Sequence, residues 1–193
     1  MSLQNKKIGI ALCGSFCNLH KAFEIIQLLN SNGADVTAII SYNVARLNTR
    51  FFSAEEVLSR LEKLTEKEVI REITEAEPIG PKDMFDIVLV LPATGNTIAK
   101  LANAITDTPV LMAIKSQLRN KKPVLIGIST NDALSNNAAN IGKLMNMENV
   151  FFIPFSQDDP ENKQSSVIFK DEYVKPALES ALEKKQIQPL ITV

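Results

Sequence analysis

Two groups of hydroxyl and amide side chains stand out in the sequence, and each directly follows a short apolar run. Gly14 and Ser15 come after the first run, and Thr94, Asn96 and Thr97 come after a later one. Where a buried parallel strand leads through such a turn into a helix, backbone N–H groups and hydroxyls point toward an anion above the sheet. We therefore expect the two loops together to hold one nucleotide-type phosphate without any lysine or arginine.

Each loop also has an interpretation that involves no ligand. The first contains a single glycine, so it has neither the dinucleotide pattern GxGxxG nor the Walker pattern GxxxxGK[ST], and a plain turn into a helix is the alternative. In the second loop, Thr94 or Asn96 could serve only as the N-cap of the following helix. The sequence leaves both alternatives open.

Cys13, Cys17 and His20 have a spacing that resembles a metal site, but the chain contains no further cysteine or histidine. Since a structural zinc site takes four protein ligands, we expect no metal here. We interpret Cys13 as a buried residue at the end of a strand and Cys17 as a small residue of the loop. A helix N-terminus lowers the pKa of a thiol, so Cys17 is a candidate reactive thiolate, although no partner base is evident.

The composition is that of a chain that buries a sizeable core. Its 193 residues are 45% hydrophobic and 22% charged, and 21 Lys and Arg against 22 Asp and Glu give a net charge of −1. Because no positive excess attracts phosphate backbones or anionic lipids, we expect neither a nucleic-acid nor a membrane partner. No apolar run approaches the roughly 20 residues of a membrane span, and residues 1–7 are polar, so we expect one cytoplasmic domain over residues 1–193.

Apolar runs of strand length alternate with amphipathic helical patterns along almost the whole chain. Strands are expected at residues 7–13, 35–41, 86–91, 123–129 and 150–154, with a weaker edge candidate at 68–73. Helices are expected at residues 20–31, 53–64, 96–105, 109–118, 137–147 and 170–184, and irregular structure at 42–52, 74–83, 130–136 and 156–166. Alternation of this kind predicts a three-layer α/β fold of Rossmann-like or flavodoxin-like type, an open, mostly parallel sheet with helices on both faces.

The two polar loops resemble those of the flavoprotein superfamily, which includes flavin-dependent cysteine decarboxylases and flavin prenyltransferases. Its members bind FMN with a glycine–serine loop after the first strand and a Pro-Ala-Ser/Thr-x-Asn-Thr loop later, here residues 92–97. The resemblance implies FMN as cofactor and these contact residues: Gly14, Ser15, Ser41, Thr94, Asn96 and Thr97. It also implies a homo-oligomer, a trimer or larger, with FMN at subunit boundaries.

Longer segments resemble the family of dipicolinate synthase B subunits over nearly the whole chain. They include AEPIGPK at 76–82, ANAITDTPVLMA at 102–113, STNDAL at 129–134 and PFSQD at 154–158. These enzymes make pyridine-2,6-dicarboxylate in sporulating bacteria by oxidising dihydrodipicolinate, and they have a second, nicotinamide-binding A subunit. The resemblance implies an oxidoreductase subunit in the cytoplasm of the mother cell, with the A subunit as partner and NADP bound through it.

A dicarboxylate substrate calls for cationic groups, preferably arginine, because a guanidinium binds a carboxylate through two hydrogen bonds. Arg46 and Arg50 follow the second expected strand, and we favour Arg50; an exposed arginine paired with a surface acid is the alternative. Residues 129–140 resemble the superfamily region that lines the flavin ring and substrate. Of the candidates there, Asn131, Asp132 and Asn140, only Asp132 could remove a proton, and a turn or N-cap role is its alternative.

The resemblance thus predicts an FMN-binding subunit in which the dihydropyridine ring gives a hydride to the flavin and a ring proton to a base. In one version of this hypothesis, the nicotinamide of the A subunit accepts the hydride directly. The main alternative is a non-catalytic structural partner of the A subunit that keeps the fold without bound flavin. A stand-alone flavin-dependent decarboxylase or prenyltransferase is a third hypothesis, but the catalytic histidine of the cysteine decarboxylases has no clear counterpart, since His20 lies in the second turn after the loop.

Overall fold

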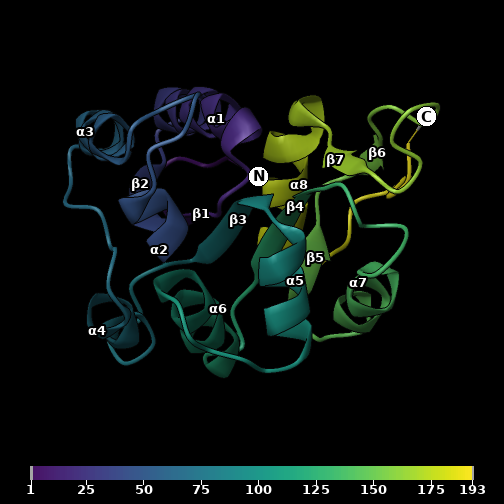
Figure 1. The fold of residues 1–193 in the computed structure, drawn as a ribbon. Coiled ribbons are helices and arrows are strands. Elements are labelled where there is room, and N and C mark those ends of the chain that lie inside the picture. The colour runs from purple at the N-terminus through teal and green to yellow at the C-terminus, as the bar shows by residue number, and fades with distance from the viewer. Residues whose placement is uncertain (1, 193) are drawn as a thin grey trace.

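Strands rich in Ile, Val and Leu form the centre of the computed structural model, which describes residues 2–192 (Figure 1). They are β1 (Lys7–Leu12), β2 (Asp35–Ile40), β3 (Ile87–Ala93), β4 (Val124–Thr130) and β5 (Val150–Phe152). These strands pair in parallel in the order β2-β1-β3-β4-β5. Near-continuous apolar sequence suits strands that are covered on both faces, and the expected α/β fold with a mostly parallel sheet is confirmed.

Two short antiparallel strands that were not expected from the sequence complete a seven-stranded sheet. β7 (Val167–Phe169) pairs with the last two residues of β4 and with β6 (Phe155–Gln157). Three-residue strands are too short to show an alternating apolar pattern, so the expectation of irregular structure over 156–166 was wrong at residues 156 and 157, which belong to β6. The hairpin matters for function because the residues that connect β6 to β7 lie beside the carboxyl end of β4.

Helices cover both faces of the sheet, as Figure 1 shows. One face carries α1 (Leu19–Ser31), α3 (Ala54–Thr65) and α8 (Val174–Leu182). The other carries α4 (Ile73–Ala76), α5 (Gly95–Ala102), α6 (Pro109–Arg119) and α7 (Ala138–Met145). Successive residues of a strand point to opposite faces of the sheet and so pack into two separate hydrophobic cores. In β1, Ile10 packs into the core beneath α1, α3 and α8, and Ala11 packs into the core on the other face. Within residues 2–192 no helix combines the length and apolarity that crossing a membrane requires.

A local capping signal accounts for the start of α3. The Ser53 hydroxyl accepts a hydrogen bond from the Glu56 N–H at 3.1 Å, which is the expected capping interaction at the start of α3. The segment 68–73 differs from the expected edge strand: Ile70 alone bridges to β2, and α4 begins at Ile73. Part of the stretch expected to be irregular forms α2 (Tyr42–Arg46), directly after β2.

Candidate functional site

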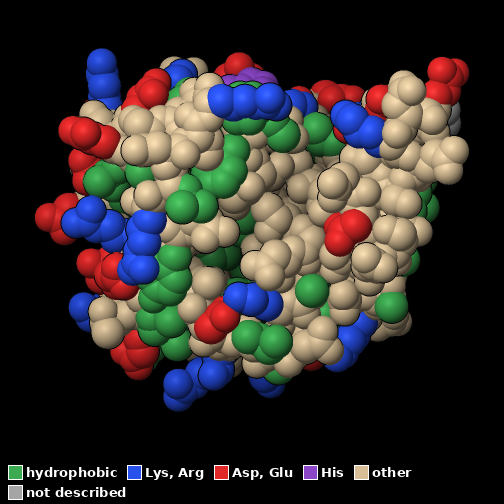
Figure 2. All heavy atoms as spheres, viewed as in Figure 1, with side chains coloured by type: hydrophobic (Ala, Val, Ile, Leu, Met, Phe, Trp, Pro, Cys, Tyr) green, Lys and Arg blue, Asp and Glu red, His purple; other side chains and the backbone are tan. Residues whose placement is uncertain are grey.

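Polar loops follow the carboxyl ends of β1 to β4 and surround a main cavity of about 630 Å3. A side pocket of about 390 Å3 adjoins it, and Gly14, Thr94 and Asn96 line both hollows. In Figure 2, uncharged polar groups and backbone cover most of the middle of the face in view, and charged side chains lie mainly toward its margins. The carboxyl edge of a parallel sheet is where open α/β folds bind their ligands.

The structure brings all eight residues proposed from the sequence to the walls of these two hollows. Ser15, Arg50 and Asp132 line the main cavity, whereas Ser41 and Thr97 line the side pocket. The remaining three, Gly14, Thr94 and Asn96, line both hollows. The residues come from loops far apart in the sequence, and the parallel order of the strands places them at one edge.

The first polar loop contacts the end of β4. The Ser15 hydroxyl lies 2.9 Å from the Ser129 hydroxyl, to which the Asn18 side-chain amide also donates at 2.8 Å. Phe16–Asn18 form a 3-10 turn that leads into α1. These contacts hold the Ser15 hydroxyl at the wall of the main cavity, and Asn18, which was not singled out from the sequence, contributes to them.

The second polar loop begins α5. Thr94 is the N-cap, and its hydroxyl accepts from the Thr97 N–H at 3.3 Å and lies 3.1 Å from the Thr97 hydroxyl. The N-cap role considered as an alternative for Thr94 is therefore confirmed. It does not exclude ligand binding, because the first turn of a helix leaves N–H groups without intrahelical partners and the exposed Asn96 of that turn lines both hollows.

Ser41, at the carboxyl end of β2, has a buried hydroxyl that has no hydrogen-bond partner within residues 2–192. Leaving a buried polar group unpaired costs about 1–3 kcal/mol, so such groups are rare without a functional reason. Since the residue lines the side pocket beside Thr94 and Thr97, a bound acceptor such as a phosphate oxygen would satisfy it. The side pocket therefore fits the phosphate that the two loops were expected to hold.

Asp132 lies at the centre of a hydrogen-bonded cluster. One carboxylate oxygen accepts from the Thr130 hydroxyl at 2.6 Å and the other from the Asn137 amide at 2.7 Å. Asn140 donates to the Asn137 side chain at 2.9 Å. A Cβ on Gly95 would lie 2.5 Å from the nearer oxygen of Asp132, so this cluster packs directly on the start of α5.

The two candidate arginines lie in different surroundings. Arg46 stacks on the Tyr42 ring at 4.5 Å and lies 3.5 Å from the Glu72 carboxylate, so it forms the surface pair described as the alternative. Arg50 lies over the Phe51 ring at 4.8 Å and lines the main cavity, and no carboxylate within residues 2–192 forms an ion pair with it. Arg50 is thus the guanidinium that is free to bind an anion.

The two cysteines differ in exposure. Burial raises the pKa of the Cys13 thiol to about 11, so this thiol is uncharged at neutral pH. Cys17 is exposed and lines the main cavity. No group of three metal-binding side chains lies close enough together in the described part of the chain to hold a metal ion.

The hairpin between β6 and β7 supplies residues that were not expected from the sequence. Asp158, Lys163 and Ser166 line the main cavity, and the Lys163 ammonium lies 3.6 Å from the Asp158 carboxylate. Only the PFSQD segment hinted at this region, and its two three-residue strands carried too little pattern to place the loop. This wall of the cavity could therefore not be predicted from local sequence patterns.

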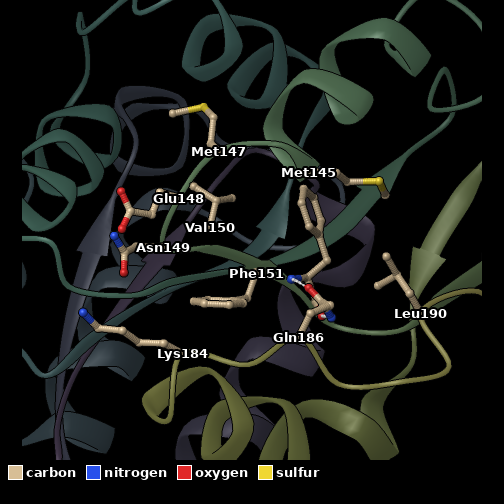
Figure 3. Close-up of a pocket in the computed structure, with 10 residues that line it drawn as sticks. Met145, Met147, Glu148, Asn149, Val150, Phe151, Lys184, Gln186 and Leu190 are labelled. Atoms are coloured by element: carbon tan, nitrogen blue, oxygen red, sulfur yellow. Dashed lines mark hydrogen bonds between the residues drawn. The ribbon is translucent and has the colours of Figure 1, made fainter.

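A separate hollow of about 390 Å3 borders the free edge of β5 (Figure 3). There the Gln186 side chain accepts from the Phe152 N–H and donates to the Phe152 carbonyl, both at 2.8 Å, as a neighbouring strand would. Met145, Met147 and Leu190 lie around it. None of the polar loops at the carboxyl edge lines this hollow, and Gln186 completes the hydrogen bonding of the β5 edge there.

Comparison with known proteins identifies the family. The model of the flavoprotein family matches residues 1–174. The chain belongs to the flavoprotein family. It is also 46% identical over 190 residues to the B subunit of Bacillus subtilis dipicolinate synthase, an alignment that covers 98% of this chain and 95% of that protein.

Solved structures share the architecture of this chain. The crystal structure of the dipicolinate synthase B subunit from Bacillus halodurans matches with a TM-score of 0.92 and 40% identity, covering 100% of this chain and 99% of the other. The FMN-dependent cysteine decarboxylase SpaF matches with a TM-score of 0.68 and 18% identity, over 94% and 98% of the two chains. The second likeness shows a common fold.

Proposed function

We propose that the chain is the FMN-binding subunit of an enzyme that oxidises dihydrodipicolinate to dipicolinate. The identity to a dipicolinate synthase B subunit supports the reaction, and membership in the flavoprotein family supports the cofactor. The observation that carries the cofactor assignment is the buried, unpartnered hydroxyl of Ser41 in the side pocket, which has no partner within residues 2–192. When bound, FMN would supply the hydride acceptor for the reaction.

The chain's own residues would bind and orient the cofactor and the substrate. Five of the six proposed cofactor contacts line the side pocket, so we assign the phosphate to it: Gly14, Ser41, Thr94, Asn96 and Thr97. Ser15 faces the main cavity, which we assign to the flavin ring and the substrate. Arg50 would hold a substrate carboxylate, and Asp132 would receive the ring proton, positioned by its bonds to Thr130 and Asn137.

The proposal includes partners and a cellular setting. By analogy with the relative's designation as a B subunit, we propose a nicotinamide-binding A subunit as partner, with NADP bound through it. We also propose a homo-oligomer, a trimer or larger, of one-domain subunits in the mother-cell cytoplasm of a sporulating bacterium. Sedimentation of the purified chain would test the oligomeric state.

The decisive experiment is an absorption spectrum of the purified chain and a titration with FMN, followed by anaerobic addition of dihydrodipicolinate. Saturable binding and loss of the flavin band at about 450 nm without an A subunit would support catalysis at the flavin. Flavin binding without bleaching, with turnover appearing only when the A subunit and NADP are added, would assign the hydride to the nicotinamide. Failure to bind FMN, alone and with the A subunit, would leave the structural-partner alternative.

A further inference from the structure

The main cavity carries two cationic side chains among its lining residues, and they come from opposite ends of the sheet. Arg50 belongs to the segment that follows β2, and Lys163 to the connection between β6 and β7. β2 and β6 are the first and last strands in the sheet order β2-β1-β3-β4-β7-β6. The two positive charges therefore approach the cavity from different walls.

The Lys163 ammonium is available to a ligand. Its contact with Asp158, at 3.6 Å, is longer than the roughly 2.7–2.9 Å of a good charge-assisted hydrogen bond, and its side chain is 57% exposed. Its backbone is held, since its N–H donates to the Asp159 carbonyl at 2.7 Å and its carbonyl accepts from the Ser166 N–H at 2.9 Å. A fixed backbone with a flexible, weakly paired ammonium is suited to reach a carboxylate inside the cavity.

The charges of the lining select for ligand shape more than for net charge. Asp132 and Asp158 balance the two cations in number, so the cavity has no strong overall field for anions. Two hydrogen bonds fix the Asp132 carboxylate in place, and the two cationic side chains come from separate segments of the lining. A rigid acid with one carboxylate on each side of the ring nitrogen, as in pyridine-2,6-dicarboxylate, offers one carboxylate to each wall, whereas a monocarboxylate can use only one wall.

We propose that Lys163 determines the specificity of this site for dicarboxylates by binding the carboxylate that Arg50 does not hold. This inference rests on the proposed function, because the substrate class comes from it. The arginine would hold one carboxylate through a planar pair of hydrogen bonds, and the lysine would meet the other as a point charge. Lys163 is then the residue that distinguishes a pyridine with two carboxylates from one with a single carboxylate.

The test compares the binding of pyridine-2,6-dicarboxylate and pyridine-2-carboxylate to the full chain with FMN added, by calorimetry. We expect Lys163→Gln to weaken the dicarboxylate about tenfold and the monocarboxylate less than twofold, and Lys163→Arg to keep the preference. Arg50→Gln should weaken both acids. Lys121→Gln, an exposed lysine just before the amino end of β4, is the matched control and should change neither.

A dicarboxylate preference that survives Lys163→Gln would overturn the inference, and so would an equal loss for both acids. Absence of dicarboxylate binding by the wild-type chain would do the same. If FMN itself does not bind, the proposed function fails separately, and the same titrations on the flavin-free chain still decide the role of Lys163. A preference that depends on Lys163 in that case would support the dicarboxylate site without the flavin.

Discussion

The Ser41 hydroxyl is the group that supports the proposed function most directly. Most buried hydroxyls offset their desolvation with a hydrogen bond inside the protein, and this one has none within residues 2–192. Its neighbours in the side pocket, Thr94 and Thr97, bond to each other rather than to it. The free donor is consistent with a site shaped for a ligand at some expense of stability.

Ser41→Ala should therefore affect stability and binding in opposite directions. Removing an unsatisfied buried hydroxyl should leave the free energy of unfolding of the flavin-free chain unchanged or raise it by up to about 1 kcal/mol. FMN affinity should fall about tenfold, the equivalent of roughly 1.4 kcal/mol. Urea unfolding and flavin titration measure the two effects.

Ser53→Ala is the matched control for that change. It removes the cap of α3, which lies on the opposite face of the sheet from α5, so it should cost about 1 kcal/mol of stability and leave FMN affinity unchanged. If Ser41→Ala destabilised the free chain and left flavin binding intact, the assignment of the side pocket to a phosphate would fail.

The two thiols should differ in reactivity. At pH 8 a disulfide reagent should modify the exposed Cys17 quickly, whereas the buried Cys13, with its pKa raised by burial, should react only after unfolding. Counting the released chromophore before and after adding denaturant checks this. Rapid modification of two thiols per folded chain would contradict the burial of Cys13.

The Cys13 thiol makes the free energy of unfolding depend on pH in the alkaline range. Its pKa rises from 9.0 to about 11 on folding, so the unfolded chain loses this proton first. The resulting stabilisation is complete below pH 9 and is lost as the pH rises toward 11. In a comparison across this range, Cys13→Ala should lose less stability than the unsubstituted chain, and equal losses would show that other groups dominate.

At the scale of elements, the start of α5 is where two loops depend on each other. A Cβ on Gly95 would meet the oxygen of Asp132 at 2.5 Å, the Asn137 amide at 2.6 Å and the Thr130 hydroxyl at 2.8 Å. Asp132 accepts hydrogen bonds from both Thr130 and Asn137, so the three side chains cannot all move away without breaking those bonds. The absence of a side chain at residue 95 thus couples the second polar loop to the Asp132 cluster.

Gly95→Ala should consequently destabilise the chain by about 1–3 kcal/mol and weaken FMN binding, because overpacking displaces the polar cluster. Gly142→Ala is the control: it lies within α7, a Cβ there has nothing within 4 Å, and alanine should stabilise the helix by about 0.5–1 kcal/mol. Thermal unfolding with and without FMN measures both variants. Equal stability changes of the same sign would contradict the coupling.

The arrangement of the whole molecule places the site where several elements end together. Loops after β1, β2, β3 and β4, together with the β6–β7 connection, all contribute to it. A ligand that contacts so many segments binds only the folded chain, because these segments do not lie together in the unfolded chain. Binding therefore stabilises the fold as a whole.

FMN at 100 times its dissociation constant should accordingly raise the free energy of unfolding by about 2.7 kcal/mol. For a chain of this size that corresponds to a rise of roughly 5–10 °C in Tm. Differential scanning fluorimetry over a range of FMN concentrations checks the shift, with riboflavin as a comparison that has no phosphate. An equal shift with riboflavin would argue against the phosphate contacts.

Much of the architecture is encoded locally. The five buried strands, the long helices and the two polar loops lie where apolar periodicity and capping residues predicted them, because those signals depend on neighbours within a few residues. The caps at Ser53 and Thr94 are clear cases. The resemblance of longer segments to a known family also followed from the sequence, and the 46% identity supports it.

Tertiary structure decided the rest. It paired three-residue strands into the β6–β7 hairpin, directed Arg46 to a surface acid and Arg50 to the cavity, and brought Lys163 to another wall of that cavity. It also left the Ser41 hydroxyl without a partner among residues 2–192. Each of these features depends on contacts between segments far apart in the chain, and a local pattern carries no information about which distant residue will lie beside it.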